Sequence, residues 1–133
     1  MKILLAGSLN NLLPIVRSLT ETNNHVTIIN NDRRECEKLA DLTDHMVIYG
    51  EATQKEALTE AHIRNFDLVV ALTDNDAVNL LICDLAKRLF GVRRSLASVT
   101  CPALEDILKR LGVDEALSYP EIAVRMTARP LIA

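Results

Sequence analysis

Hydrophobic residues fall into short runs, separated by longer stretches in which apolar positions recur every three or four residues. The runs are three to six residues long and rich in Val, Ile, Leu and Ala, which is typical of buried β-strands. They cover residues 2–6, 25–30, 46–49, 67–72, 95–99 and 116–118. The pattern predicts six strands, and the run at 67–72 is so continuously apolar that we expect it to be central.

The stretches between the runs have the spacing of amphipathic helices. The expected apolar faces are Leu12, Leu13, Val16 and Leu19; Cys36, Leu39 and Leu42; Ala57, Leu58 and Ala61; Ala77, Leu80, Leu81, Leu85 and Leu89; and Leu104, Ile107, Leu108 and Leu111. Gly91 and Gly112 stand where two of these helices should end. Alternating strands and helices indicate βαβ units, so we expect an α/β fold with a doubly wound, mainly parallel six-stranded sheet of Rossmann-like type.

Composition and charge narrow the function classes. The chain has 133 residues, of which 49% are hydrophobic, and this suits one domain with a continuous core. A net charge of −3 and an aromatic content of 3% argue against nucleic-acid binding, which needs excess positive charge and stacking rings. The apolar runs are too short for membrane insertion, and the three cysteines form no CxxC pair. Because the first strand follows Met1 at once, we expect no signal peptide. We therefore expect a cytoplasmic protein.

The segment after the first strand is a candidate phosphate-binding turn, because doubly wound folds bind ligands at the carboxyl ends of their strands. Dinucleotide-binding proteins carry G-x-G-x-x-G at this place. Here Gly7 is present, but Leu9 and Leu12 occupy the other two glycine positions. We expect the Leu9 side chain to stand where a pyrophosphate would bind. The alternative interpretation is a turn that holds no ligand.

The end of the second strand is a candidate ribose site. Asn30 lies 23 residues after Gly7, close to where a carboxylate binds the adenosine ribose in such folds. Asparagine accepts one such hydrogen bond but has no charge. Asn31, Asp32 and Arg33 follow, so a contact with ribose or phosphate is one interpretation. The other is that Asp32 caps a helix whose first turn is solvated.

Three later groups of residues form a combination that points to a family. They are Gly50-Glu51-Ala52-Thr53; Asp67-Leu68-Val69-Val70-Ala71-Leu72-Thr73 with Asp76, Asn79 and Ala86-Lys87; and Leu111-Gly112-Val113-Asp114 with Ser118, Pro120, Glu121 and Arg125. Together they resemble the N-terminal RCK/KTN (TrkA-N-like) domain, a cytosolic regulator of potassium channels and transporters. The resemblance runs from Lys2 to about Arg129.

This resemblance implies a nucleotide-binding regulatory domain. In the family, the glycine-rich turn and the second-strand carboxylate bind NAD(H) or adenine nucleotides such as ATP, ADP or AMP, and a Gly-Asp-Ala-Thr tetrapeptide lies near the adenine. Carried over by position, the candidate cofactor-binding residues are Gly7, Ser8, Leu9, Asn10, Asn11, Asn30, Asn31, Arg33, Glu51, Ala52, Thr73 and Asp74. The chain departs from the family pattern at Leu9, Leu12, Asn30, Glu51, Ser98 and Thr100. These departures argue against tight pyrophosphate binding.

The resemblance also implies partners. They are further copies of the chain, as a homodimer or larger ring, and a membrane potassium transporter or channel subunit that would hold the chain at the inner face of the membrane. Residues 1–119 would form the Rossmann-like domain, and residues 120–133 a terminal crossover and dimerisation segment. Its apolar residues are Ile122, Val124, Met126, Leu131 and Ile132. Alternatively, this segment folds back on its own sheet or continues into a C-terminal domain.

Catalytic signatures are missing from the sequence, which contains no HExxH, GxSxG, P-loop or CxxC motif. Cys101 precedes a helix, but an inert cysteine is the more common case. Glu51 and Asp76 are expected to be solvated or capping rather than a metal site. We therefore expect a regulatory domain of a potassium uptake system and no enzyme. The alternatives are a ligand-free oligomerisation scaffold and a fragment of an NAD-dependent oxidoreductase, which would need a substrate domain.

Overall fold

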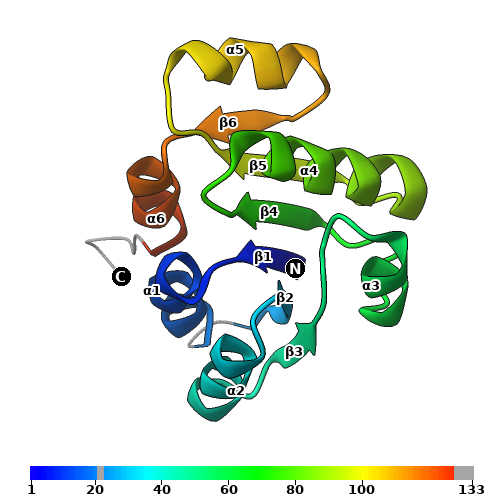
Figure 1. Cartoon of the computed structure of the whole chain (residues 1–133), viewed down its shortest axis with the longest axis vertical. Coiled ribbons are helices and arrows are strands. Elements are labelled where there is room, and N and C mark those ends of the chain that lie inside the picture. Colours follow the sequence, from blue (N-terminus) through cyan, green and yellow to red (C-terminus); the bar gives the residue numbers. More distant parts are fainter. Residues whose placement is uncertain (21–22, 128–133) are drawn as a thin grey trace.

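The computed structural model describes residues 1–20 and 23–127, and within them six strands alternate with six helices (Figure 1). The strands are β1 (Lys2–Gly7), β2 (His25–Asn30), β3 (Met46–Tyr49), β4 (Leu68–Leu72), β5 (Arg94–Ser98) and β6 (Glu115–Leu117). The helices are α1 (Leu9–Thr20), α2 (Arg33–Leu42), α3 (Lys55–Glu60), α4 (Asp76–Phe90), α5 (Ala103–Arg110) and α6 (Tyr119–Thr127). Every predicted strand is present, with bounds within one residue of the prediction. None of the described helices has both the length and the apolar character needed to cross a membrane.

All six strands pair in parallel, in the order β3-β2-β1-β4-β5-β6. The chain starts in the middle of the sheet at β1, builds outward to β3, then returns to β4 and builds outward to β6. The two halves meet between β1 and β4, where Gly7 lies opposite Leu72. This is the Rossmann order, so the predicted doubly wound fold is confirmed. The β1–β4 junction is the switch point at which such sheets bind ligands.

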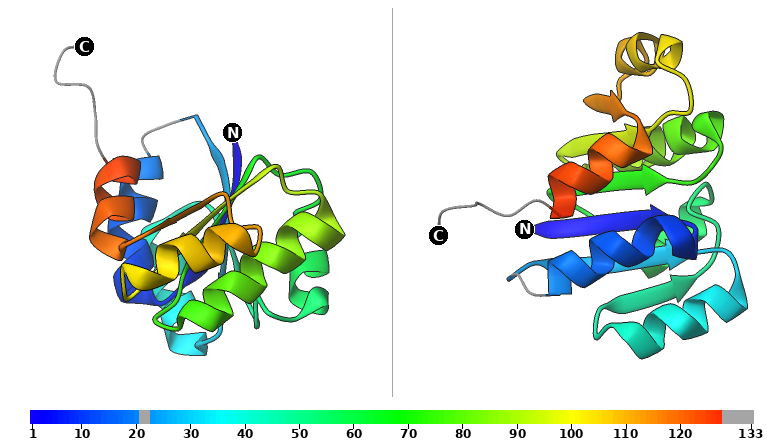
Figure 2. Two further views of the ribbon diagram at one scale, coloured as in Figure 1. Left: turned by 90° about the horizontal axis from the view of Figure 1, so that it is seen from above. Right: turned by 90° about the vertical axis from the view of Figure 1, so that its left-hand side faces the viewer.

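Helices cover both faces of the sheet (Figures 1 and 2). Helices α1, α2 and α6 bury one core layer, which contains Leu5, Ile15, Ile28, Leu39 and Ile122. Helices α3, α4 and α5 bury the other, which contains Leu4, Ile29, Leu58, Ile82 and Leu108. Successive strand residues point to opposite faces, and both faces are covered, so the strands read as continuous apolar runs.

The face that helix α4 turns to the sheet coincides only in part with the one that its leucines predict. Its buried residues are Asn79, Ile82, Cys83, Ala86 and Phe90. Leu81 and Leu89, which the pattern placed inside, are 43% and 36% exposed. The small side chains of Cys83 and Ala86 fit the close approach of the helix to β4 and β5, and the polar Asn79 is buried because its hydrogen bonds are satisfied. Leu80 and Leu85 are half-buried and pack against this core layer, as predicted. The prediction of the α4 face was therefore wrong at Ala77, Leu81 and Leu89, which are exposed.

Helix α6 folds back against α1 of its own domain (Figure 2). Ile122 is fully buried there, and the Tyr119 hydroxyl donates to the main-chain oxygen of Asn11 at 2.7 Å. This arrangement agrees with the alternative in which the segment folds back on its own sheet, because Ile122 belongs to one of the two core layers. Val124 is 65% exposed, whereas Leu131 and Ile132 lie outside the described residues. A dimerisation role for residues 120–133 stays a prediction.

Candidate functional site

A cleft of about 470 Å³ opens at the carboxyl ends of β1 to β4, in the size range of small-molecule sites. Its walls come from the four loops that follow these strands. The lining consists of Ala6, Gly7, Ser8, Ile29, Asn30, Asn31, Asp32, Glu35, Gly50, Glu51, Ala52, Thr53, Thr73, Asp74, Asn75, Val78 and Ile82. The cleft lies at the β1–β4 switch point, so the topology places it where ligands bind in this fold.

Eight of the twelve residues predicted from the sequence meet in this cleft. They are Gly7, Ser8, Asn30, Asn31, Glu51, Ala52, Thr73 and Asp74. They come from segments far apart in the sequence, and the parallel sheet brings them to one edge. The structure thus shows one shared cleft, while cofactor binding by these residues stays a prediction.

The other four predicted residues lie outside the cleft lining: Leu9, Asn10, Asn11 and Arg33. The Leu9 side chain packs against the core on the α1 side of the sheet, so it does not stand at the pyrophosphate position as expected. Asn11 Nδ2 donates to the carbonyl oxygen of Leu72 at 2.8 Å and so joins α1 to the end of β4. The Arg33 guanidinium lies over the Tyr49 ring, 5.6 Å from its centroid.

Gly7 is required by the packing of the sheet itself. A Cβ atom at this position would lie 2.6 Å from the carbonyl oxygen of Leu72, closer than real Cβ contacts come. Gly7 pairs with Leu72 in the sheet, so the loops that follow β1 and β4 start side by side at the cleft. The one glycine that remains of the fingerprint therefore has a structural reason to be there, whether or not a phosphate binds.

The side chain of Asn30 forms its hydrogen bonds within the protein. It is 2% exposed, and its Nδ2 donates to the carbonyl oxygen of Gly7 at 3.0 Å and to Glu35 Oε1 at 2.9 Å. Its Oδ1 accepts the N–H of Asp32 at 2.7 Å. Because both ends of the amide are used, Asn30 joins the ends of β1 and β2 and is not positioned to bind a ribose as a free acceptor.

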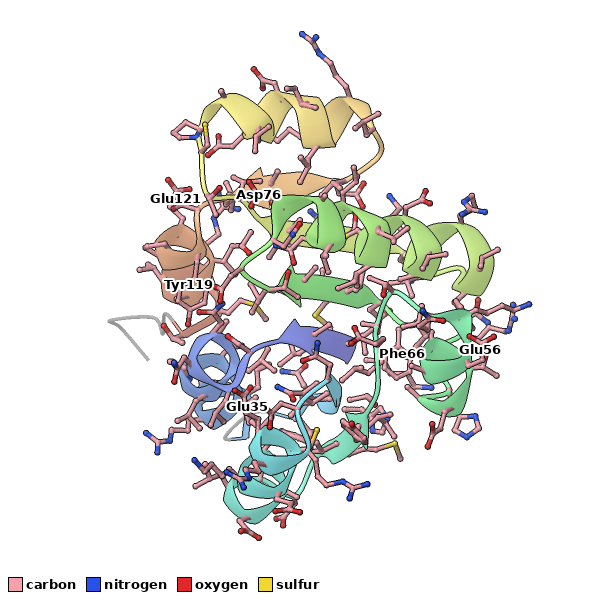
Figure 3. The ribbon with its side chains drawn as sticks, viewed as in Figure 1. Glu35, Glu56, Phe66, Asp76, Tyr119 and Glu121 are labelled. Carbon is pink, nitrogen blue, oxygen red and sulfur yellow. The ribbon has the colours of Figure 1, made fainter. Side chains whose placement is uncertain are left out.

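Glu35 is a charged cleft residue that the sequence analysis did not include among the candidate binding residues. It belongs to the first turn of α2, beside α1 (Figure 3), and its Oε1 accepts the N–H of Leu9 at 2.8 Å, the first N–H of α1. The available signal was the spacing of Asp32 and Glu35, which is that of a capping box. In a capping box the glutamate would turn back to the Asp32 N–H. Here Asn30 takes that N–H, and Glu35 reaches α1 instead.

The cleft carries concentrated negative charge, with Asp32 and Glu35 on the wall that follows β2. Four lining residues are carboxylates, namely Asp32, Glu35, Glu51 and Asp74. Among the described residues, no lysine or arginine lines the cleft. Burial, followed by the charges of Asp32, Glu35 and Glu37, raises the pKa of the neighbouring Cys36 thiol. The field at this wall therefore opposes the addition of another anion.

A network of polar side chains, buried at Asn79 and exposed at Thr100, holds the wall formed by the β4–α4 loop. Asn79 Oδ1 accepts the Thr73 N–H at 2.9 Å, and Asp76 accepts the N–H and the hydroxyl of Thr100. Asp76 therefore joins α4 to the segment before α5. Within the described part of the chain, no cluster of three or more His, Cys, Asp or Glu residues could hold a metal ion.

The sequence matches the family model of the TrkA-N domain over residues 11–119. The chain belongs to the TrkA-N family. A Trk system potassium uptake protein TrkA homolog from Methanothermobacter thermautotrophicus is 33% identical to this TrkA-N domain over 125 residues. The alignment covers 91% of the chain and 57% of the relative, so the chain spans little more than half of that protein.

Solved structures show the same fold as this TrkA-N domain. The TrkA-N domain of the inner membrane protein ybaL from Escherichia coli has a TM-score of 0.76 at 18% identity, covering 94% of this chain and 93% of its own. The GsuK channel bound to NAD has a TM-score of 0.76 at 19% identity, covering 87% of this chain and 21% of its own. Another GsuK structure is bound to ADP.

Proposed function

We propose that this TrkA-N domain is the cytoplasmic regulatory part of a potassium uptake system, controlled by an adenine nucleotide or NAD(H) in the cleft. The observation that carries the proposal is a ligand-sized cleft at the β1–β4 switch point of a chain whose relative is a potassium uptake protein. The GsuK structures with NAD and ADP support the choice of ligand. A ligand in the cleft would contact four loops at once. It shifts the equilibrium between two conformations of the domain when its affinity for one conformation is higher than for the other.

Regulation fits the cleft better than catalysis does. Of the described residues, no histidine, cysteine or lysine lines the cleft, so it offers no side chain of the usual nucleophile or proton-shuttle types beyond its carboxylates and hydroxyls. As the family resemblance suggests, the partners would be further copies of the chain and a membrane potassium transporter or channel subunit. The domain would then lie at the inner face of the membrane through that partner.

A melting-temperature series tests the proposal. The protein is heated with millimolar adenosine, AMP, ADP, ATP, NAD⁺ or NADH, with inorganic phosphate as the ionic control. A ligand at 100 times its Kd adds about 2.7 kcal/mol to the free energy of unfolding, which raises the melting temperature of a domain of this size by several degrees. No shift with any adenine ligand would refute nucleotide control and favour a ligand-free scaffold.

A cleft variant shows whether a shift comes from this site. Asn31 is exposed and lines the cleft. The substitution Asn31→Trp places a bulky ring at the entrance without disturbing the core, so it should abolish the shift while the unliganded melting temperature stays within about 2 °C. A shift that survives this substitution would place the ligand elsewhere on the domain.

A further inference from the structure

The anion position of the cleft is already filled by a carboxylate of the protein. In dinucleotide-binding folds, the pyrophosphate binds at the N-terminus of the helix that comes after the first strand, where main-chain N–H groups point outward. Here that helix is α1, and its first N–H, on Leu9, donates to Glu35 Oε1 at 2.8 Å. A carboxylate and a phosphate oxygen compete for the same donor, so Glu35 stands where a ligand phosphate would be bound.

Two donors hold the Glu35 carboxylate in this place. Besides Leu9, Asn30 Nδ2 donates to the same oxygen at 2.9 Å. The Asn30 amide is itself buried and oriented by Gly7 and Asp32. The main-chain N–H of Glu35 is held as well, because it donates to Asp32 Oδ1 at 3.0 Å. The carboxylate is therefore part of a fixed hydrogen-bonded corner that joins β1, β2, α1 and α2.

The charge of the cleft strengthens this exclusion. Asp32, Glu51 and Asp74 also line it, and the lining residues of the described chain include no lysine or arginine to neutralise a diphosphate. Like charges a few ångströms apart repel, most strongly where water is partly excluded. The hydroxyls of a ribose and the edge of an adenine carry no charge, so a nucleoside avoids this repulsion.

We propose that Glu35 is a specificity-determining residue, which makes the cleft bind an adenosine-type nucleoside in preference to ADP or NAD⁺. The inference rests on the proposed function for the adenine part of the ligand. It adds that a ligand without phosphate groups on the ribose is preferred. A nucleoside leaves the Glu35–Leu9 hydrogen bond intact. A diphosphate binds only after Glu35 leaves the Leu9 N–H, so its affinity is lowered by the free energy of that displacement.

Calorimetric titration of three proteins with adenosine, ADP, NAD⁺ and pyrophosphate tests the proposal. The proteins are the wild type, Glu35→Ala and the control Glu37→Ala, which removes an exposed carboxylate from the same helix. We expect Glu35→Ala to bind ADP and NAD⁺ at least about tenfold more tightly than the wild type, equivalent to about 1.4 kcal/mol, and adenosine within about threefold. Glu37→Ala should match the wild type. Equal ADP affinity in the wild type and Glu35→Ala, or an equal gain for adenosine, would overturn the proposal.

Glu35→Gln keeps the test decisive if the alanine variant does not fold. It preserves an acceptor oxygen for the Leu9 and Asn30 donors and removes only the charge, so ADP affinity should rise several-fold; no rise would overturn the proposal. ADP bound equally tightly by the wild type and by both Glu35 variants would overturn this inference and leave the proposed function standing. A third outcome is that only the Glu35 variants bind ADP and that the wild type binds no adenine ligand. This result would support the exclusion of phosphate by Glu35 and overturn nucleotide control. No binding by any protein would overturn both.

Discussion

Asn79 Nδ2 donates to the carbonyl oxygen of Ser98 at 2.9 Å and thereby joins helix α4 to the end of β5. The same side chain accepts the main-chain N–H and the hydroxyl of Thr73 through Oδ1. Asn79 is 0% exposed and Ser98 is 5% exposed, so removing the Asn79 side chain would take a hydrogen bond from the Ser98 carbonyl oxygen in the protein interior. Thr73, which lines the cleft, would lose its bonds to Asn79 at a part-buried position. One asparagine therefore holds together the ends of the two strands beside the cleft.

The substitution Asn79→Ala should lower the free energy of unfolding by about 2–4 kcal/mol, since it removes the hydrogen bonds that Asn79 makes to the buried Ser98 carbonyl oxygen and to the part-buried main chain of Thr73. Urea denaturation followed by circular dichroism measures the change. Asn10→Ala is the matched control, because Asn10 is exposed on α1, and it should change stability by no more than about 0.5 kcal/mol. A loss below about 1 kcal/mol for Asn79→Ala would mean that the network does not hold this wall.

The fold could be predicted from the sequence because its determinants are local. Each buried strand is a short aliphatic run, and each connection has helical spacing, so order and handedness follow from general rules. The burial of Asn79 on α4 could not be predicted in this way. From its polarity alone, Asn79 is expected at the surface. Its burial is favourable because the carboxyl ends of β4 and β5 supply hydrogen-bond partners, which only the folded structure brings close.

The candidate site, like the fold, has one part that could be predicted from the sequence and one that could not. The residues at the ends of β1 to β4 could be placed in one cleft from topology alone, because parallel strands end at one edge. The hydrogen bond from the α1 N-terminus to Glu35 could not be predicted, because Glu35 lies 26 residues from Leu9 in the sequence. The capping-box spacing instead predicts that Glu35 accepts the Asp32 N–H. The pairing depends on Asn30, whose side chain satisfies the Asp32 N–H first.

The close approach of β1 and β4 predicts that Gly7→Ala is strongly destabilising. The new methyl group would lie 2.6 Å from the Leu72 carbonyl oxygen, and main-chain atoms of a central strand cannot move aside without breaking pairing. We expect a loss of about 2 kcal/mol or more in urea denaturation. Gly50→Ala is the control: its methyl group would approach only the Ala57 side chain, at 3.2 Å, and should cost clearly less. Equal losses for the two variants would contradict the packing role of Gly7.

Asp114 predicts a pH-dependent part of the stability. Burial raises its pKa, but hydrogen bonds from Lys87 and Ser95 outweigh this effect, so the pKa of Asp114 lies below its ordinary value of 3.8. A carboxyl group with a lowered folded-state pKa stabilises the protein above about pH 4, and this contribution is lost as the pH falls through the folded-state pKa. The Lys87–Asp114 pair, 2.7 Å apart, is about one-third exposed, so solvent screening limits the effect.

We therefore expect Asp114→Asn to lose about 1 kcal/mol of stability at pH 7, and the difference from the wild type to shrink towards about pH 3. Urea denaturation at several pH values measures both quantities. Asp41→Asn removes an exposed carboxylate from α2 and should show a small difference that does not change over the same range. A difference for Asp114→Asn that grows on acidification would have the wrong sign for this assignment.

The three cysteines should differ sharply in reactivity because the thiolate is the reacting form. Burial raises the pKa of Cys83 from 9.0 to about 12, which lowers its thiolate fraction about a thousandfold, and Cys36 is also buried with a raised pKa. Cys101 is exposed. In native protein at about pH 8, a chromogenic disulfide reagent should therefore modify one thiol per chain rapidly, and the other two only in denaturing urea. Cys101→Ser should abolish the rapid phase, whereas Cys83→Ser should leave it unchanged; rapid modification of two thiols in the folded protein would show that the α2 or α4 face is not packed as described.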